Sequence, residues 1–348
     1  MTAARTLADR MVDDLAERGE LAEQWRVAFA EVPRHLFIPD TVWRQDRGRP
    51  GHDLVPVRRA DDPDGWLRMA YENCSVITQV DDGRSTDGDA GWEVTSSASM
   101  PAVVAQMLAA LDVEPGMRVL EIGTGTGYNA ALLAHRLGAS SVTSIEIDPE
   151  VAGHARRALA IAGFEEVTVV TGDGTSGYPP HAPFDRVICT AAAERLPHPW
   201  IAQTTPGGKV LVPWATAYYP AGLLTLTVHT DGTATGRIGE PAAFMWLRDQ
   251  RVPRYQLASV FDATPDYTVI RTDSHPADVA GDRHAATAIG LRVPRCQFLY
   301  DPDTADTGTL YLIDQWDGSW ASLHLTSDGP PYEVRQAGPR SLWDELQA

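Results

Sequence analysis

The 348-residue sequence contains few cysteines, few basic residues and no long apolar run. Its three cysteines are odd in number and far apart, so they offer neither a disulfide framework nor zinc-ligand spacing. No apolar run approaches the ~20 residues that a membrane-spanning helix needs. The sequence has 29 Lys and Arg but 47 Asp and Glu. The resulting net charge of −18 argues against a nucleic-acid surface, which needs clustered cations. We therefore expect no membrane or nucleic-acid partner and no metal site.

The first residues also lack the apolar core of a secretory signal. They begin instead with a polar stretch that has the pattern of an amphipathic helix. Reduced thiols are typical of proteins that stay inside the cell. We expect a cytoplasmic protein, and a monomer.

What the chain does contain is a glycine-rich segment after an apolar run, V-L-E-I-G-T-G-T-G-Y at residues 119–128. Glycines let a backbone pass close to a ligand where a Cβ would clash. A dinucleotide fingerprint needs G-x-G-x-x-G, but Tyr128 occupies the position of the third glycine. Glu121 suits the cationic amino-acid end of S-adenosylmethionine better than it suits a pyrophosphate. The segment predicts a site for S-adenosylmethionine, with an ordinary strand-to-helix turn as the alternative.

Further apolar runs of strand length follow and alternate with helical patterns. This alternation predicts an α/β fold with a doubly wound, Rossmann-like parallel sheet whose two faces are both covered. Glu146 ends the second strand about 20 residues after the glycines, where a ribose diol is held in such folds. Asp173 follows the third strand. We expect Gly125, Glu146 and Asp173 to meet at the carboxyl edge of the sheet.

Several segments make the chain resemble protein-L-isoaspartate O-methyltransferases over roughly residues 5–250. They are V-P-R-H-L-F-I-P at 32–39, Y-E-N at 71–73, S-M-P at 99–101, residues 118–134 and G-D-G at 172–174. The resemblance implies a class I S-adenosyl-L-methionine-dependent methyltransferase fold, a carboxyl-methylating activity, and Ser99 as the active-site serine. The cofactor contacts that it implies are Glu121, Gly123, Thr124, Gly125, Gly127, Glu146, Ile147, Asp173 and Gly174.

The chemistry of carboxyl methylation limits what Ser99 has to do. A carboxylate with a pKa near ~3.9 is already ionised at neutral pH, and a sulfonium methyl group is already activated. A serine nucleophile would need a neighbouring base, and no sequence feature supplies one. We expect the Ser99 hydroxyl to orient the acceptor carboxylate. Its alternative role is to cap a helix at residues 101–111.

The chain departs from the family pattern in two places. Residues 74–98 form a longer link to Ser99 than is usual, and their acidic, glycine-rich composition predicts a surface loop near the active site. Typical members end near Arg251, whereas this chain continues. We expect a methyltransferase domain at 1–251, helical over about 1–100, and a small α+β extension at 252–348. Within the extension we expect a strand pair around Asp317-Gly318 and a terminal helix at 340–346.

The last segment, G-P-R-S-L-W-D-E-L at 338–346, resembles the ending of extended family members that are encoded with ribosomally made, modified peptides. That resemblance implies methylation of an ordinary aspartate in a constrained peptide, leading to an aspartimide or isoaspartate. The alternatives are repair of isoaspartyl residues in damaged proteins, methylation of a small carboxylate, and a non-catalytic cofactor-binding protein. The expected partner is a peptide or protein that bears aspartate or isoaspartate. The extension alone is also compatible with a packing appendage or a dimer arm.

Overall fold

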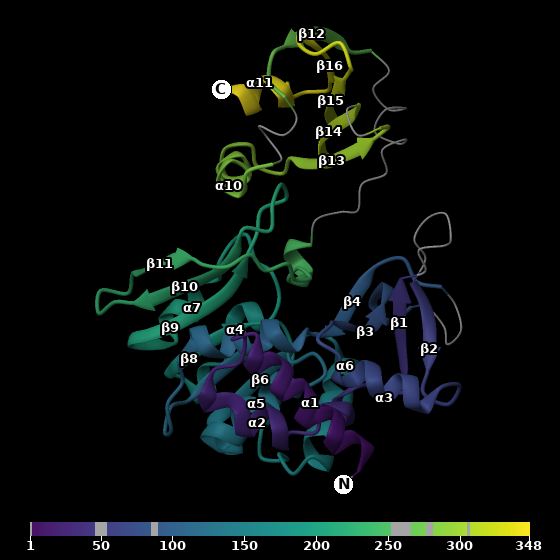
Figure 1. Cartoon of the computed structure of the whole chain (residues 1–348). Coiled ribbons are helices and arrows are strands. Elements are labelled where there is room, and N and C mark those ends of the chain that lie inside the picture. Colours follow the sequence, from purple (N-terminus) through teal and green to yellow (C-terminus); the bar gives the residue numbers. More distant parts are fainter. Residues whose placement is uncertain (1, 46–53, 85–89, 252–265, 276–280, 305–306) are drawn as a thin grey trace. The chain divides into compact units, whose positions relative to one another are not determined.

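A computed structural model describes residues 2–45, 54–84, 90–251, 266–275, 281–304 and 307–348 (Figure 1). The chain forms two compact units whose segments alternate along the sequence. The first unit comprises Met1–Ala191, Leu196–Val212 and Leu223–Gly239, and the second comprises Ala192–Arg195, Pro213–Gly222 and Glu240–Ala348. The expected division into domains at residue 251 stays a prediction.

A seven-stranded sheet of order β11-β10-β9-β8-β5-β6-β7 forms the centre of the larger unit. Its strands are β5 (Val119–Ile122), β6 (Val142–Glu146), β7 (Thr168–Thr171), β8 (Phe184–Cys189), β9 (Thr204–Trp214), β10 (Gly222–Val228) and β11 (Ala234–Ile238). Strands β5 to β9 are parallel, whereas β10 and β11 pair antiparallel. Every residue of β5 and β6 is buried, and successive strand residues face opposite sides, so both faces are covered. The predicted doubly wound class I methyltransferase fold is confirmed.

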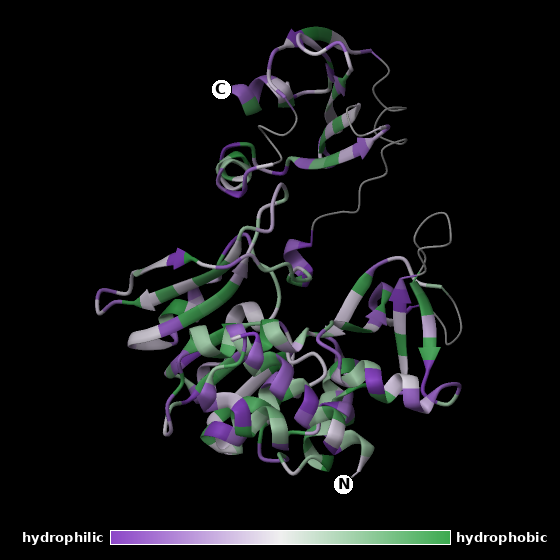
Figure 2. Ribbon diagram, in the orientation of Figure 1, coloured by the Kyte–Doolittle hydropathy of each residue, from purple (hydrophilic) through white to green (hydrophobic). Residues whose placement is uncertain are grey.

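Helices surround this sheet, and the apolar residues gather in the strands and in the helix faces turned toward them (Figure 2). The helices are α1 (Ala3–Glu17), α2 (Arg26–Glu31), α4 (Pro101–Leu111), α5 (Tyr128–Leu137), α6 (Pro149–Ile161) and α7 (His198–Ala202). Helix α6 shows why they begin where they do: Asp148 caps it by accepting from the amides of Glu150 and Val151 at 3.0 and 3.2 Å, and Pro149 occupies its first position. Short 3-10 turns complete the unit at Glu23–Trp25, Arg34–Phe37, Asp81–Gly83, Ala139–Ser141, Gly174–Ser176 and Pro179–His181. None of the described helices is long and apolar enough to span a membrane.

A second sheet of the larger unit contains both ends of the stretch that we expected to be a surface loop. Four antiparallel strands, in the order β2-β1-β3-β4, accompany one helix: β1 (Thr41–Gln45), β2 (Leu54–Arg58), β3 (Val76–Val80), β4 (Val94–Ala98) and α3 (Pro63–Tyr71). The loop prediction for 74–98 is therefore wrong at both ends, where β3 and β4 pair as a hairpin. The Asp81 carboxylate holds the hairpin end by accepting from the amides of Trp92 and Glu93 at 3.1 and 2.8 Å. Residues 85–89 lie outside the described residues.

The smaller unit is built around a five-stranded antiparallel sheet of order β12-β16-β15-β14-β13. Its elements are β12 (Thr268–Thr272), β13 (Gln297–Pro302), β14 (Gly308–Asp314), β15 (Ser319–Leu325), β16 (Tyr332–Ala337), α10 (Arg283–Arg292) and α11 (Leu342–Gln347), with a 3-10 turn at Arg248–Gln250. The expected strand pair around Asp317-Gly318 is β14–β15, and the expected terminal helix is α11, so both are confirmed. Leu342 and Trp343 are completely buried in this unit's core.

An ion-pair cluster fixes the start of α11 to the end of β14. The Asp314 carboxylate is completely buried and accepts from Arg340 Nη1 at 2.8 Å and from Arg295 Nη2 at 2.9 Å. Arg340 also pairs with Glu345 on the first turn of α11. The arginine of the terminal G-P-R-S-L-W-D-E-L segment is thus part of the fold of the smaller unit.

Replacing Arg340 with alanine should lower the free energy of unfolding of the smaller unit by on the order of 3 kcal/mol, because it leaves a buried carboxylate with less compensation. Native-state hydrogen exchange of the β14 and β15 amides measures this locally. The matched control is Arg335→Ala, which breaks a pair with Glu333 whose side chains are 42% and 38% exposed. That variant should lose less than about 1 kcal/mol. Equal losses in the two variants would contradict the role given to Arg340.

Candidate active site

The glycine segment leaves β5 and turns sharply above the end of β6. The amides of Gly123 and Thr124 donate to the Ile145 carbonyl at 2.8 and 3.1 Å, and the three glycines have φ values of +91°, +53° and +91°. A Cβ at Gly123 would lie 2.6 Å from the Thr190 hydroxyl oxygen, and one at Gly127 would lie 3.3 Å from Ala155 on α6. Packing inside the protein therefore accounts for the first and third glycines.

Gly125 differs from the other two glycines. A Cβ there would approach only the Ser97 carbonyl oxygen, at 3.7 Å. Gly125 instead borders a cavity of about 330 Å³, which it lines together with Thr126, Ser96 and the first turns of α6. Its backbone thus faces open space, as a ligand-binding loop requires.

The predicted ribose ligand, Glu146, lies at the carboxyl end of β6. Its carboxylate accepts from the Gly125 amide at 2.9 Å and from the Asp148 amide at 3.1 Å, so it connects the loop to the cap of α6. Ile147 follows and is 40% exposed. Asp173 follows β7 and accepts from the Thr175 amide and hydroxyl at 2.9 and 2.8 Å. The sheet register places the ends of β5, β6 and β7 side by side, so the predicted meeting of these residues at one edge is confirmed.

The remaining predicted cofactor residues lie around the same edge. Thr124 and Gly174 are buried, and a Cβ at Gly174 would collide with Ile122 at 2.6 Å. Thr124 shares a 2.6 Å hydrogen bond with Ser144 on β6. The direct contacts of these residues with a cofactor stay predictions.

Glu121 is completely buried beneath the loop and is bonded to the protein itself. Its carboxylate accepts from Asn129 Nδ2 at 2.7 Å and from the Ser144 hydroxyl. Burial raises its pKa to about 7, although both hydrogen bonds act in the opposite direction. Its partners belong to α5 and β6, so Glu121 braces the loop from below. Its expected contact with the amino-acid end of the cofactor stays a prediction, and the sequence analysis did not identify Asn129 or Ser144.

Ser99 lies between β4 and α4, half-buried, two residues after the Ser97 carbonyl that approaches Gly125. The structure therefore brings the segment that leads into the predicted serine next to the glycine loop. The alternative role of Ser99 as a helix cap is wrong. Met100 is the N-cap of α4, and the side chain of the N-cap residue makes no capping hydrogen bond. The first turn is satisfied from elsewhere, because the Ala102 amide donates to Asn73 Oδ1 at 2.9 Å.

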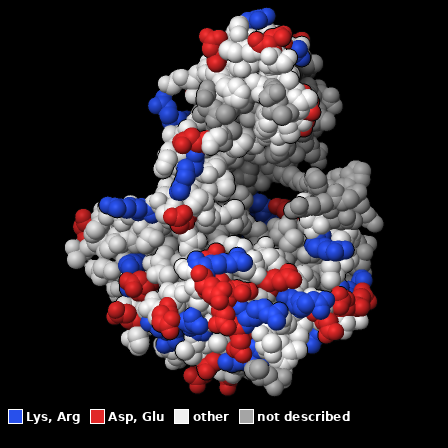
Figure 3. All heavy atoms as spheres, viewed as in Figure 1, with Lys and Arg blue, Asp and Glu red and all other residues white. Residues whose placement is uncertain are grey.

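Arg34, the arginine of the V-P-R-H-L-F-I-P segment, is a cation close to Ser99. Its side chain is completely buried and donates to backbone carbonyls, including that of Ser99 at 3.0 Å. It is therefore not exposed to a ligand. On the face shown in Figure 3, acidic and basic side chains are interspersed over the larger unit, so the acidic excess forms no single patch there. Within the described ranges, no three His, Cys, Asp or Glu side chains gather as metal ligands would.

Comparison with known proteins gives a consistent result. The family model described as protein-L-isoaspartate(D-aspartate) O-methyltransferase matches residues 68–251. A protein-L-isoaspartate O-methyltransferase of Gloeobacter violaceus is 37% identical over 242 residues, which are 69% of this chain and 98% of the relative. One from Hyperthermus butylicus is 35% identical over 248 residues, with 68% and 87% covered. A solved structure with the same name aligns with 98% of this chain and 89% of its own at a TM-score of 0.53 and 19% identity, which shows a shared fold.

Proposed function

Because this chain belongs to the protein-L-isoaspartate(D-aspartate) O-methyltransferase family, we propose that it methylates the free carboxylate of L-isoaspartyl residues in proteins and peptides. The chain is a carboxyl methyltransferase that depends on S-adenosyl-L-methionine. The observation that supports the acceptor site most directly is the approach of the Ser97 carbonyl, two residues before Ser99, to Gly125 of the glycine loop.

The residues at the sheet edge fit the cofactor. Gly125 leaves room above the loop, the Glu146 carboxylate lies at the strand end where a diol would bind, and Ile147 offers an exposed apolar surface for a base. Asp173 follows the next strand and would lie at the border of the same site. When bound, S-adenosyl-L-methionine supplies a methyl group activated by its sulfonium.

The protein's own groups then have to align the acceptor. The acceptor carboxylate is already anionic, so its oxygen can form the new C–O bond without a base. The Ser99 hydroxyl would donate to the other carboxylate oxygen and hold it in line. Alignment of this kind is worth up to roughly 7–11 kcal/mol of the barrier. The anion loses its charge in the step, so a water-poor site favours the transition state.

The product is a methyl ester on the peptide. The nitrogen of the following backbone amide can attack the ester carbonyl, lose its proton and expel methanol, which leaves a succinimide. Water then opens either carbonyl of that ring to give aspartate or isoaspartate. Repeated methylation of the isoaspartyl product would convert it gradually to aspartate.

A second candidate substrate is an ordinary aspartate in a constrained peptide, favoured by the sequence of residues 338–346. Two observations weigh against it. Leu342 and Trp343 of that segment are buried in the core of the smaller unit, and Arg340 is in its ion-pair cluster, so packing accounts for these residues. In addition, a solved protein-L-isoaspartate O-methyltransferase aligns with nearly the whole chain, so an extension of this kind does not by itself indicate another substrate.

Three acceptor peptides separate the two candidates: a linear isoaspartyl peptide, its linear aspartyl form and a cyclised aspartyl form. We expect the linear isoaspartyl peptide to gain one methyl group, as read by mass. The two linear forms differ in the placement of one methylene, a difference that binding sites discriminate by roughly 10–200-fold in kcat/KM. Methylation confined to the cyclised aspartyl peptide would overturn the repair proposal in favour of peptide tailoring.

A further inference from the structure

The backbone on both sides of Ser99 is held by side chains that come from distant parts of the chain. On one side, Arg34 Nη2 donates to the Ser99 carbonyl at 3.0 Å and to the Ala98 carbonyl at 3.5 Å. On the other side, the Asn73 side chain accepts from the Ala102 amide at 2.9 Å. The serine and the proline that starts α4 are thus bounded by two hydrogen-bonding side chains.

Arg34 connects Ser99 to two further parts of the site. Its Nη1 donates to the Ala70 carbonyl at the end of α3, and its Nη2 also reaches the Cys74 carbonyl at 3.4 Å. Its guanidinium carbon lies 5.8 Å from the ring centre of Tyr128, the first residue after the last glycine of the loop. One rigid, planar group therefore joins the end of α3, the Ser99 segment and the helix that leaves the glycine loop.

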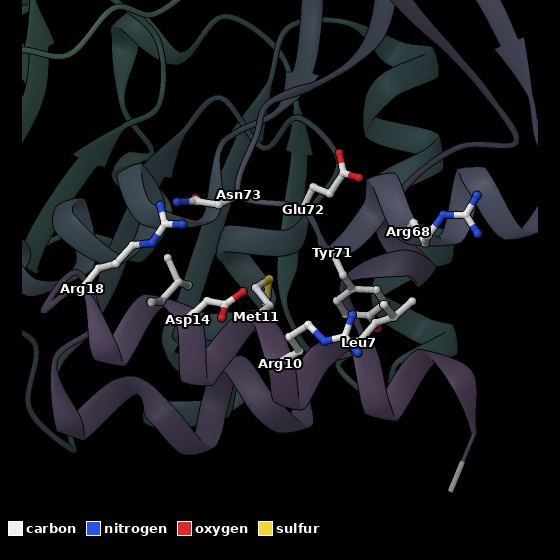
Figure 4. A pocket seen from close by; sticks show the side chains of 10 residues that line it. Leu7, Arg10, Met11, Asp14, Arg18, Arg68, Tyr71, Glu72 and Asn73 are labelled. Carbon is white, nitrogen blue, oxygen red and sulfur yellow. The ribbon is translucent and has the colours of Figure 1, made fainter.

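Asn73 is held in place by hydrogen bonds, with a cavity beside it. Its Nδ2 donates to Glu20 Oε2 at 3.3 Å, while its Oδ1 accepts from Ala102. The segment Tyr71-Glu72-Asn73 and helix α1 line a cavity of about 230 Å³, and the side chains of Asn73, Arg18 and Met11 border it (Figure 4). With a cavity on one side, Asn73 is held at the start of α4 by these two hydrogen bonds.

Taken with the proposed function, on which it rests, this geometry leads us to propose that Arg34 and Asn73 are positioning residues for methyl transfer. They act through the backbone of Ser99: Arg34 fixes its carbonyl, and Asn73 fixes the first turn of the helix that follows. A hydroxyl that orients a carboxylate must stay in place to well under 1 Å, because a displacement of that size costs about 10²-fold in rate. No side chain of α4 itself supplies this restraint.

Two conservative variants test the proposal. Arg34→Lys keeps the charge but loses the planar fork, and Asn73→Leu keeps the size but loses the acceptor. We expect each to lower kcat by roughly 10–10²-fold. The affinity for S-adenosylhomocysteine, read by calorimetry, should change by less than about threefold, since the predicted cofactor residues are untouched. Asn73→Asp retains the acceptor oxygen but places a carboxylate beside Glu20, so it is combined with Glu20→Gln, and this double variant should restore most of kcat.

Arg186 offers a matched control at the other end of the same helix. It is 8% exposed, and its guanidinium donates to the carbonyls of Leu111 and Asp112 at 2.8 and 2.9 Å. Arg186→Lys should lower the melting temperature by an amount similar to that of Arg34→Lys but leave kcat near the wild-type value. An equal loss of kcat in both arginine variants would overturn the proposal.

A double-mutant cycle with Ser99→Ala separates positioning from general stability. If Asn73 acts through the serine, Ser99→Ala/Asn73→Leu should be no slower than Ser99→Ala alone. Losses that multiply would show that Asn73 acts independently of Ser99 and would overturn the proposal. Unchanged kcat in both Asn73→Leu and Arg34→Lys would do the same.

A failure of this proposal can be told apart from a failure of the proposed function, because each variant is compared with the wild-type enzyme on the same peptide. Each ratio of variant to wild type is taken on whichever acceptor peptide the wild type methylates, so a preference for the cyclised peptide defeats repair without affecting the ratios. If the wild type methylates no peptide, hydrogen exchange decides. Faster exchange at the start of α4 in Asn73→Leu, with the end of α4 unchanged, supports the restraint, and unchanged exchange at Ala102 overturns it.

Discussion

Ser99→Ala should lower kcat for methyl transfer by about 10²–10³-fold while leaving the affinity for S-adenosylhomocysteine within about twofold of wild type. The size is that expected on removing one preorganised hydrogen-bond donor that acts on the reacting group. The structure makes the result interpretable, because Met100, not Ser99, is the N-cap of α4 and Asn73 bonds the first turn. Loss of the hydroxyl should therefore cost little stability. Single-turnover kinetics with the isoaspartyl peptide isolates the methyl-transfer step.

Ser141→Ala is the matched control for that experiment. Ser141 comes just before β6, away from the sheet's carboxyl edge, and its hydroxyl donates to the Leu137 carbonyl at 3.2 Å. We expect its kcat to stay within about threefold of wild type, since this hydrogen bond contributes about 1 kcal/mol of stability and nothing to the reaction. Full activity in folded Ser99→Ala would remove the serine from the mechanism. The role of Arg34 and Asn73 would then need another target.

Local patterns in the sequence were enough to predict which residues gather at the carboxyl edge of the sheet. The glycine spacing, the acid that ends β6 and the Gly172-Asp173-Gly174 turn each lie within a few residues of a strand end, so the parallel topology alone brings them together. The same holds for β14, β15 and α11, which follow from alternation and a terminal amphipathic pattern. In these elements, the local sequence pattern predicts the same structure that the folded protein has.

The contacts around Ser99 could not be predicted in that way. Arg34, Asn73 and Ser99 are separated by tens of residues, and nothing in the identity of an arginine indicates that it will be buried among carbonyls. The link before Ser99 was misjudged for a related reason. Its acids and glycines lie mainly at residues 81–91, and their composition concealed the flanking runs V-I-T-Q-V and V-T-S-S-A, which pair as β3 and β4. Composition averaged over a segment hides a hairpin whose turn is polar.

The hydrogen-bond partners of Glu121 could not be predicted from the sequence either. An acid two residues before a glycine loop is compatible with a direct ligand contact or with a brace below the loop. The second arrangement depends on Asn129 and Ser144, which lie eight and 23 residues further along the chain. Burial of an acid at this depth is tolerated because both carboxylate oxygens have donors.

Gly125→Val should weaken binding of S-adenosylhomocysteine by at least about 10²-fold. At φ +53° a β-branched residue is strongly disfavoured, so the loop would have to change its conformation. A valine that did keep this conformation would project its methyl groups into the space that the loop leaves open, where the chain itself comes no nearer than the Ser97 carbonyl. Glu146→Ala should act in the same direction by about 10–10²-fold, because it removes a charged acceptor from the Gly125 amide.

The control for that prediction is Gly116→Val. Gly116 also has a positive φ, +91°, and a Cβ there would meet nothing within 4 Å, but it lies before β5, away from the sheet's ligand edge. Valine at Gly116 therefore carries the same backbone strain from a positive φ but does not touch the proposed cofactor site. We therefore expect Gly116→Val to lower the melting temperature while calorimetry shows nearly unchanged affinity for S-adenosylhomocysteine. If the two variants bound it equally well, the space above Gly125 would not be the cofactor's place. The cofactor would then have to lie elsewhere along the ends of β5, β6 and β7, and the approach of the Ser97–Ser99 segment to the loop would no longer support methyl transfer at Ser99.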